Sequence, residues 1–213
     1  ILWLIFLVKN PDSNIDLNAR DNRGWTVFIG ACVYGQKHIV HFLLMDTSIE
    51  LNMQDNKGWT ALKWACSNGH KDVVKLILIY SDKIELNTRN ADGWTAFMYA
   101  CHKGYKDVVQ LLLEYSERID LNATHDGGMT AFMWACRNGY KDVVQLLLDH
   151  SERIDLNAKT NYGGITAFMM ACCRGHKDVV QLLLNHSNPR IEVNAKANTD
   201  FQTYCETCRR EEN

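Results

Sequence analysis

The chain has 213 residues, of which 46% are hydrophobic and 23% charged, as in an ordinary globular protein. Its 23 basic and 25 acidic residues give a formal net charge of −2. This balance excludes the broad single-sign field that attracts a nucleic-acid backbone or an anionic membrane surface, so neither partner is expected.

The chain begins with eight apolar residues, ILWLIFLV. They are too few to span a bilayer, and no basic region precedes them as in a secretory signal, so membrane insertion is not expected. We expect residues 1–23 to form the second helix and loop of a partial repeat. The missing first helix suggests that the chain is a fragment, and that further repeats or domains flank it in a longer protein.

The rest of the chain is built from a repeated unit. Gly-Trp-Thr or a close relative begins at Gly24, Gly58, Gly93, Gly128 and Gly164, and another glycine follows each of these after 11 residues. A period of 34 to 36 residues is typical of a solenoid. We expect full units at 24–57, 58–92, 93–127, 128–163 and 164–199. Differences in length fall in the loop after the second apolar segment, where extra chain is tolerated.

Residues 93–127 illustrate one unit. Thr95 is a natural N-cap, and Phe97 and Cys101 share one face of the helix that follows. Gly104 is expected to end this helix in a left-handed turn. A second helix with a broad apolar face should begin near Asp107. Each unit is therefore predicted to be a pair of antiparallel helices followed by a turn-rich loop.

The last segment, 200–213, continues the repeat only weakly and is expected to form a degenerate C-terminal capping helix. It contains Cys205 and Cys208, a C-x-x-C pair that could supply half of a zinc site. No second pair accompanies it, so a metal or redox site is the less favoured alternative, and we expect no metal or cofactor.

Five of the eight cysteines lie three residues before the second glycine of each unit: Cys32, Cys66, Cys101, Cys136 and Cys172. Neighbouring units should stack about 10 Å apart, which is too far for a disulfide. Free, buried thiols are expected, and with them a reducing, cytoplasmic or otherwise intracellular location.

No motif for catalysis is visible. His70 and His176 follow the second glycine of their units, a position that Tyr105 and Tyr140 occupy in other copies. Exchange with tyrosine indicates a ring that packs against its neighbours and carries a polar group at its end, and not a residue of acid–base chemistry. The sequence also lacks a phosphate-binding loop, a nucleophile elbow and a zinc-protease motif. We expect a protein that is not an enzyme.

Residues 55–78, DNKGWTALKWACSNGHKDVVKLIL, closely follow the pattern D-x-x-G-x-T-P-L-H-x-A-A-x-x-G-H-x-x-V-V-x-x-L-L. Nearly the whole chain resembles an ankyrin repeat array in this way. The resemblance implies an all-α solenoid of stacked antiparallel helix pairs joined by β-hairpin-like loops. Two departures recur in every copy: the family's Pro is Ala or Val, and its His is replaced by Ile29, Lys63, Met98, Met133 and Met169.

The resemblance also implies a concave recognition surface made of four residues in each unit. These are the residue after the first glycine, one residue of the first helix, and the two residues before the second glycine. Aromatic side chains gather at the first two positions, where packing between repeats is the alternative interpretation. The candidate partner-binding residues are Trp25, Trp59, Trp64, Trp94, Tyr99, His102, Lys103, Met129, Trp134, Arg137, Asn138, Ile165, Met170 and Arg174.

Two copies, residues 96–123 and 131–158, differ at only five places, and three of these are candidate surface positions. The changes are Tyr99 to Trp134, His102 to Arg137 and Lys103 to Asn138. We therefore expect a non-catalytic scaffold that binds a partner protein of unknown identity. The alternatives are a structural spacer within a longer array or, less favoured, the metal or redox site at the C-x-x-C pair.

Overall fold

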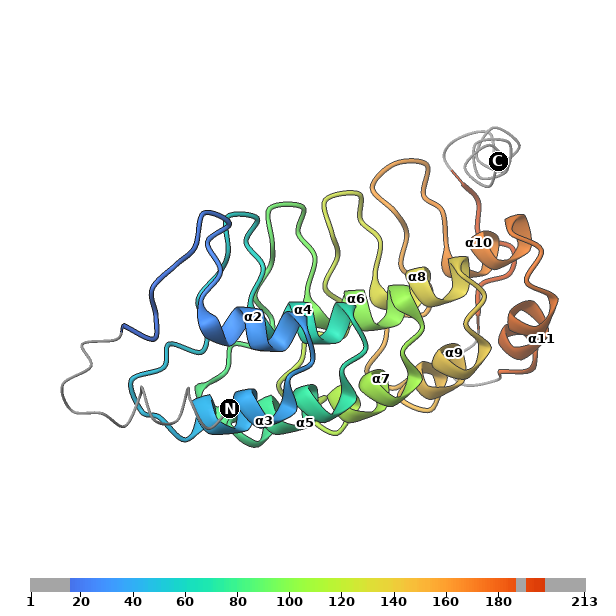
Figure 1. Cartoon of the computed structure of the whole chain (residues 1–213). Coiled ribbons are helices and arrows are strands. Elements are labelled where there is room, and N and C mark those ends of the chain that lie inside the picture. The colour runs from blue at the N-terminus through green and yellow to red at the C-terminus, as the bar shows by residue number, and fades with distance from the viewer. Residues whose placement is uncertain (1–15, 187–190, 198–213) are drawn as a thin grey trace.

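The computed structural model describes residues 16–186 and 191–197 (Figure 1). Within these ranges the chain forms five helix pairs and one short 3-10 helix, η1 (Ser81–Lys83), and its only β contacts are two isolated bridges. The helices are α2 (Val27–Val33), α3 (Lys37–Leu44), α4 (Ala61–Ser67), α5 (Lys71–Ile79), α6 (Ala96–Lys103), α7 (Lys106–Leu113), α8 (Ala131–Arg137), α9 (Lys141–Leu148), α10 (Ala167–Cys173) and α11 (Lys177–Asn185). The expected all-α solenoid of stacked helix pairs is confirmed.

The helices form two layers. The first helix of each pair (α2, α4, α6, α8, α10) lies in one layer, and the second helix (α3, α5, α7, α9, α11) lies in the other (Figure 1). The connections between pairs project past the first layer as long loops, which we call the fingers. We use "inner surface" for the surface formed by the first-layer helices and the fingers.

Each first-layer helix begins at a buried threonine. The Oγ1 of Thr95 accepts a hydrogen bond from Met98 N at 3.2 Å, and the equivalent threonines make the same contact. This cap satisfies an amide that has no partner within the helix, so the helix starts here without the family's proline. Gly104 ends α6 with a φ of 73°, as expected for a left-handed C-cap.

A column of asparagines joins successive pairs through backbone groups. The Nδ2 of Asn87 donates to the Arg118 carbonyl at 2.8 Å, and its Oδ1 accepts from Asp120 N at 2.9 Å. Asn18, Asn52 and Asn122 bond the following repeat in the same way. Because the amide bonds both a carbonyl and an N–H, it fixes one loop against the next.

The histidine or tyrosine after the second glycine packs between repeats, as the sequence indicated. A Cβ at Gly35, where φ is 64°, would lie 2.7 Å from the His70 ring. His70 Nε2 lies 2.9 Å from the Val33 carbonyl oxygen, and His176 Nε2 lies at the same distance from that of Arg137. The ring occupies the space that glycine leaves open, and its polar tip reaches the preceding repeat.

The repeated cysteines are free thiols, and four of the five are buried: Cys32, Cys66, Cys101 and Cys136. Burial raises the pKa of the Cys101 thiol well above its ordinary value, so it is unreactive. The expectation of burial is wrong for Cys172, which is exposed. Its helix, α10, is the last first-layer helix in the described residues, so no further such helix covers it. The adjacent Cys173 is disulfide-bonded.

Three expectations lie outside the described residues. They are the helix over residues 1–8, the capping helix over 200–213, and the site at Cys205 and Cys208.

Candidate protein-interaction surface

Six aromatic side chains form a continuous row on the inner surface, which we call the aromatic ladder. Its members alternate between finger and first-layer helix, and each ring contacts the next. The centroid distances are 5.5 Å for Trp25–Trp64, 4.3 Å for Trp64–Trp59, 4.3 Å for Trp59–Tyr99, 4.7 Å for Tyr99–Trp94 and 4.8 Å for Trp94–Trp134. The three longer distances lie in the range that aromatic pairs favour, and the two of 4.3 Å are slightly shorter. The ladder therefore links four successive repeats without a break.

The ladder is neither fully buried nor freely exposed. Trp25, Trp59, Trp64, Trp94 and Tyr99 are half-buried, and only Trp134, at 8% exposure, counts as core. Packing between repeats and exposure on the inner surface were alternatives at the level of sequence. In the structure the same rings do both, because each packs on its neighbours and keeps part of its surface accessible.

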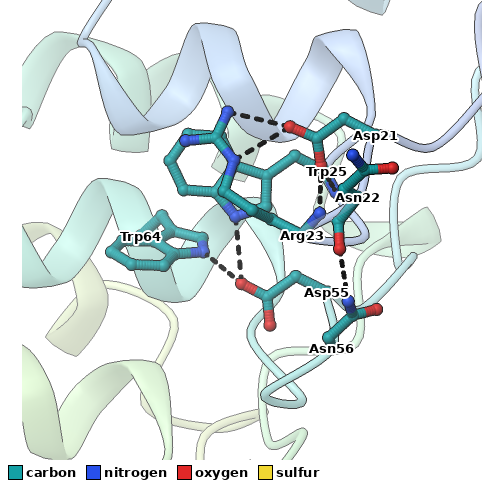
Figure 2. Close-up of polar contacts among 7 residues, drawn as sticks. All are labelled: Asp21, Asn22, Arg23, Trp25, Asp55, Asn56 and Trp64. Atoms are coloured by element: carbon teal, nitrogen blue, oxygen red, sulfur yellow. Dashed lines mark hydrogen bonds and ion pairs between the residues drawn. The ribbon is translucent and has the colours of Figure 1, made fainter.

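A buried carboxylate holds the N-terminal end of the ladder. Figure 2 shows Asp55 between two indoles: its Oδ2 accepts from Trp25 Nε1 at 3.3 Å and from Trp64 Nε1 at 3.0 Å. Its Oδ1 accepts from the backbone N–H groups of Lys57 and Trp59, each at 2.9 Å. Asp55 is only 6% exposed, and these four donors compensate for the loss of water around its charge.

The preceding finger repeats this turn at the surface (Figure 2). Asp21 Oδ1 accepts from Trp25 N at 2.8 Å, and this bond lowers the pKa of the carboxyl group. Arg23 donates from Nε to Asp21 Oδ2 at 2.9 Å, and its guanidinium carbon lies 3.7 Å from the Trp25 ring centroid. Asn56 of the next finger donates to the Asn22 carbonyl oxygen at 3.0 Å, which ties the two fingers together.

The finger residue that caps the turn also contacts the aromatic residue on the helix. Asp55 bonds Trp64, while in the next copy Asn90 Nδ2 donates to the Tyr99 hydroxyl at 3.2 Å. In the fourth copy this residue is His125, whose ring lies 5.6 Å from that of Trp134. Sequence reasoning missed these polar partners. The only signal in the sequence was that a polar residue stands at this finger position in every copy: Asp21, Asp55, Asn90, His125 and Thr160.

Lys63 is a second residue whose role was missed. It takes the place of the family's histidine, where other copies have Ile or Met, and it is 0% exposed. Its Nζ donates to the Gly58 carbonyl oxygen at 3.1 Å. Burial lowers the pKa of this amine to about 8, while the nearby Asp55 charge acts in the opposite direction.

The predicted polar residues of the inner surface come together beyond Trp134. A pocket of about 320 Å³ is lined by His102, Lys103, Arg137, Asn138, Tyr140, Arg174 and His176. The Arg137 guanidinium carbon is 5.1 Å from the Trp134 ring centroid, and the His102 and Trp134 centroids are 4.7 Å apart. We call this the basic pocket, and it continues directly from the end of the ladder.

Three further candidates lie in the last two repeats. Met129 is partly buried against the core. Ile165 and Met170 are each 1% exposed, so their assignment to a partner-binding surface is wrong. Both side chains are apolar and belong to the hydrophobic core, which explains why the ladder does not extend into the fifth repeat.

The fold and this surface define a repeat protein of stacked helix pairs with an aromatic inner surface. Family models for ankyrin repeats match residues 2–90 and 77–160, described as three copies, and residues 140–184, described as many copies. The chain therefore belongs to the ankyrin repeat family. The comparison with curated proteins gives no match.

Two searches of the described residues give negative results. No group of three or more His, Cys, Asp or Glu side chains is arranged to hold a metal ion. None of the helices in this part of the chain is both long enough and apolar enough to cross a membrane.

Proposed function

We propose that the chain is a non-catalytic scaffold that binds a partner protein through its inner surface, the concave face of the array. One observation carries the proposal: five half-buried aromatic rings stand in one unbroken row along this surface. Tryptophan and tyrosine are enriched among the residues that dominate binding energy, and burying the accessible part of several rings together supplies an apolar centre for an interface.

In this proposal the residues have two roles. Trp59, Trp64, Trp94 and Tyr99 anchor the partner through apolar contact, since their rings are already fixed by their neighbours and lose little freedom on binding. The polar side chains of the basic pocket select the partner. Ankyrin repeats act generally as protein-interaction modules, which fits this division.

A structural spacer is the second candidate, because the same ring contacts cross every boundary between the first four repeats. Contacts between neighbours are what stabilise a repeat array, so an aromatic ladder would also stiffen a spacer.

Site-specific photocrosslinking distinguishes the two. A photoreactive phenylalanine analogue is placed either at Trp59 in the ladder or at Ile79, a 65% exposed residue of α5 in the other layer. The two proteins are then irradiated separately in extracts of the source cells. A binding scaffold gives discrete protein adducts from the Trp59 position and none from Ile79. Adducts from neither position, or equal adducts from both, would favour the spacer.

A further inference from the structure

An apolar groove lies at the C-terminal end of the described array, beside α10 (Figure 1). Its volume is about 320 Å³. We call it the end groove. The residues that line it come from α10 and from the chain after α11, and all six have apolar side chains or a neutral thiol: Phe168, Met169, Cys172, Val193, Ala195 and Ala197.

The same positions are covered in the preceding repeat. Cys172 is exposed, whereas Cys136 at the equivalent position of α8 is 0% exposed. Val193 is 37% exposed, whereas Leu156 at its equivalent position is 3% exposed. The difference arises because α8 packs against α10, while no first-layer helix follows α10 within the described residues. The end groove is therefore the face on which a further first-layer helix would pack.

The chain carries a matching sequence directly after the groove. Residues 198–213 lie outside the described residues and follow the last residue that lines the groove. When the repeat is continued into this segment, Tyr204 falls at the position of Phe132, which is 1% exposed. Cys208 falls at the position of Cys136. The segment thus offers apolar side chains at the positions that fill the core in earlier copies.

The bonding of the cysteines points to the same segment. Cys173, which adjoins the groove residue Cys172, is disulfide-bonded. Five of the eight cysteines of the chain are free thiols. This leaves Cys205 and Cys208 as the candidates for the partner of Cys173, and both belong to the segment after the groove.

A side chain at the position of Cys173 faces the following repeat. In the third repeat this position is His102, whose ring centroid lies 4.7 Å from that of Trp134 in the next first-layer helix. In the repeat register, Glu206 has the position of Trp134 and comes directly after Cys205. A helix packed on the end groove in this register therefore places a cysteine close to Cys173.

We propose that residues 200–208 dock in the end groove as a further first-layer helix, and that a disulfide from Cys173 to Cys205 or Cys208 holds them there. The proposal goes beyond the proposed function, because it concerns the end of the array and not its inner surface. The bond forms by exchange with a small disulfide such as oxidised glutathione. Each protein thiol gives up one proton and one electron, and the small disulfide takes up both pairs and leaves as two thiols. Reduction reverses the exchange and releases the segment from the groove.

Alkylation of the full chain with iodoacetamide tests the proposal, with each cysteine followed by peptide mass spectrometry. After treatment with oxidised glutathione, mapping should find Cys173 linked to Cys205 or Cys208. Cys172 should then react at least about 10-fold more slowly than in the variant C173S, because the docked segment covers it. Ser67 occupies the equivalent position of the second repeat, so C173S is expected to fold. An unlinked Cys173, or equal rates for Cys172 in the two proteins, would overturn the proposal.

The buried Cys101 is an internal control, since it should remain unreactive in every folded variant. A non-reducing gel checks that the bond lies within one chain. A monomer supports the proposal, and a disulfide-linked dimer would contradict it.

The variant Y204D tests the contact with the groove and keeps both cysteines of the segment. A carboxylate at the position of a core phenylalanine opposes docking, so Cys172 should react in oxidised Y204D about as fast as in C173S. The matched control is R210D, which places the same charge at the position of the half-buried Asn138, and it should leave Cys172 protected. Protection that persists in Y204D, or that is lost equally in R210D, would contradict docking through the groove.

Discussion

The two ends of the aromatic ladder differ in how the indole N–H groups are hydrogen-bonded. At the N-terminal end, the indole N–H groups of Trp25 and Trp64 both donate to Asp55. At the C-terminal end, Trp134 Nε1 is buried and has no hydrogen-bond partner among the described residues. There the finger residue is His125, and the neighbouring basic pocket is lined by Lys103, Arg137 and Arg174. One end is closed by an internal carboxylate, while the other is bordered by a pocket of hydrogen-bond donors.

Copies of one repeat can therefore differ in role, with some residues contributing mainly to stability and others to the surface proposed to bind a partner. In the second repeat a buried acceptor with four donors holds the finger against the helix. At the other end Lys103, Arg137 and Arg174 line the basic pocket, so positive side chains gather at the ends of the first-layer helices of the last three repeats.

The largest effect is expected from removing the internal carboxylate. D55A leaves two indole and two backbone N–H groups without their acceptor, and should lower the free energy of unfolding by about 2–4 kcal/mol. H125A, at the equivalent position of the fourth repeat, removes the hydrogen bond that His125 Nδ1 accepts from Gly127 N, and should cost about 1 kcal/mol. Urea denaturation followed by circular dichroism measures both. Equal losses would contradict the difference between the two ends.

The second prediction concerns the buried lysine. K63M places at this position the residue found at Met98 and Met133, and should stabilise the protein near pH 7 by up to about 3 kcal/mol, since a pKa unit corresponds to about 1.4 kcal/mol. The pKa of Lys63 is lowered from 10.5 to about 8 in the folded state. Between these values the unfolded chain binds more protons, so the wild type gains stability with rising pH.

The gap between K63M and the wild type should therefore narrow from pH 8 to pH 10.5. Comparing the two proteins at each pH cancels the contribution of the buried cysteines, which both share. A gap that stays constant across this range would show that Lys63 is not held in the core as an amine with a lowered pKa.

The smallest effects on stability are expected for Trp64 and Trp134, which occupy the same position of their repeats. W64F removes a hydrogen bond to Asp55 and should cost about 1 kcal/mol, whereas W134F removes an N–H group that has no partner among the described residues and should change stability by less than about 0.5 kcal/mol. Thermal unfolding of the two variants measures the difference. A larger loss for W134F would mean that the fourth repeat depends on its indole N–H as much as the second does.

The helices and the core could be predicted from sequence because their causes are local. Thr95 caps the amide three residues ahead, and Gly104 reverses the chain at its own position. The candidate surface was predicted only in part. The rows of tryptophans were visible, but the contact between Trp59 and Tyr99 joins two repeats and depends on how the repeats stack.

The predictions that failed also depended on how the repeats pack together. Ile165 and Met170 occupy the same repeat positions as Trp94 and Tyr99, yet they are core residues, because burial depends on the size of the side chain and on the neighbours that cover it. The burial of Lys63 could not be predicted either, because nothing in the sequence indicates that its amine reaches a carbonyl oxygen within the fold.

The most direct test of the binding role of the ladder combines recognition and stability in one variant. W94M interrupts the ladder with the residue found at Met129, in a chain that carries the photocrosslinker at Trp59. We expect adducts with the partner protein to fall at least 5-fold, while the free energy of unfolding falls by no more than about 2 kcal/mol. Undiminished adducts from a strongly destabilised protein would show that the ladder only holds the repeats together.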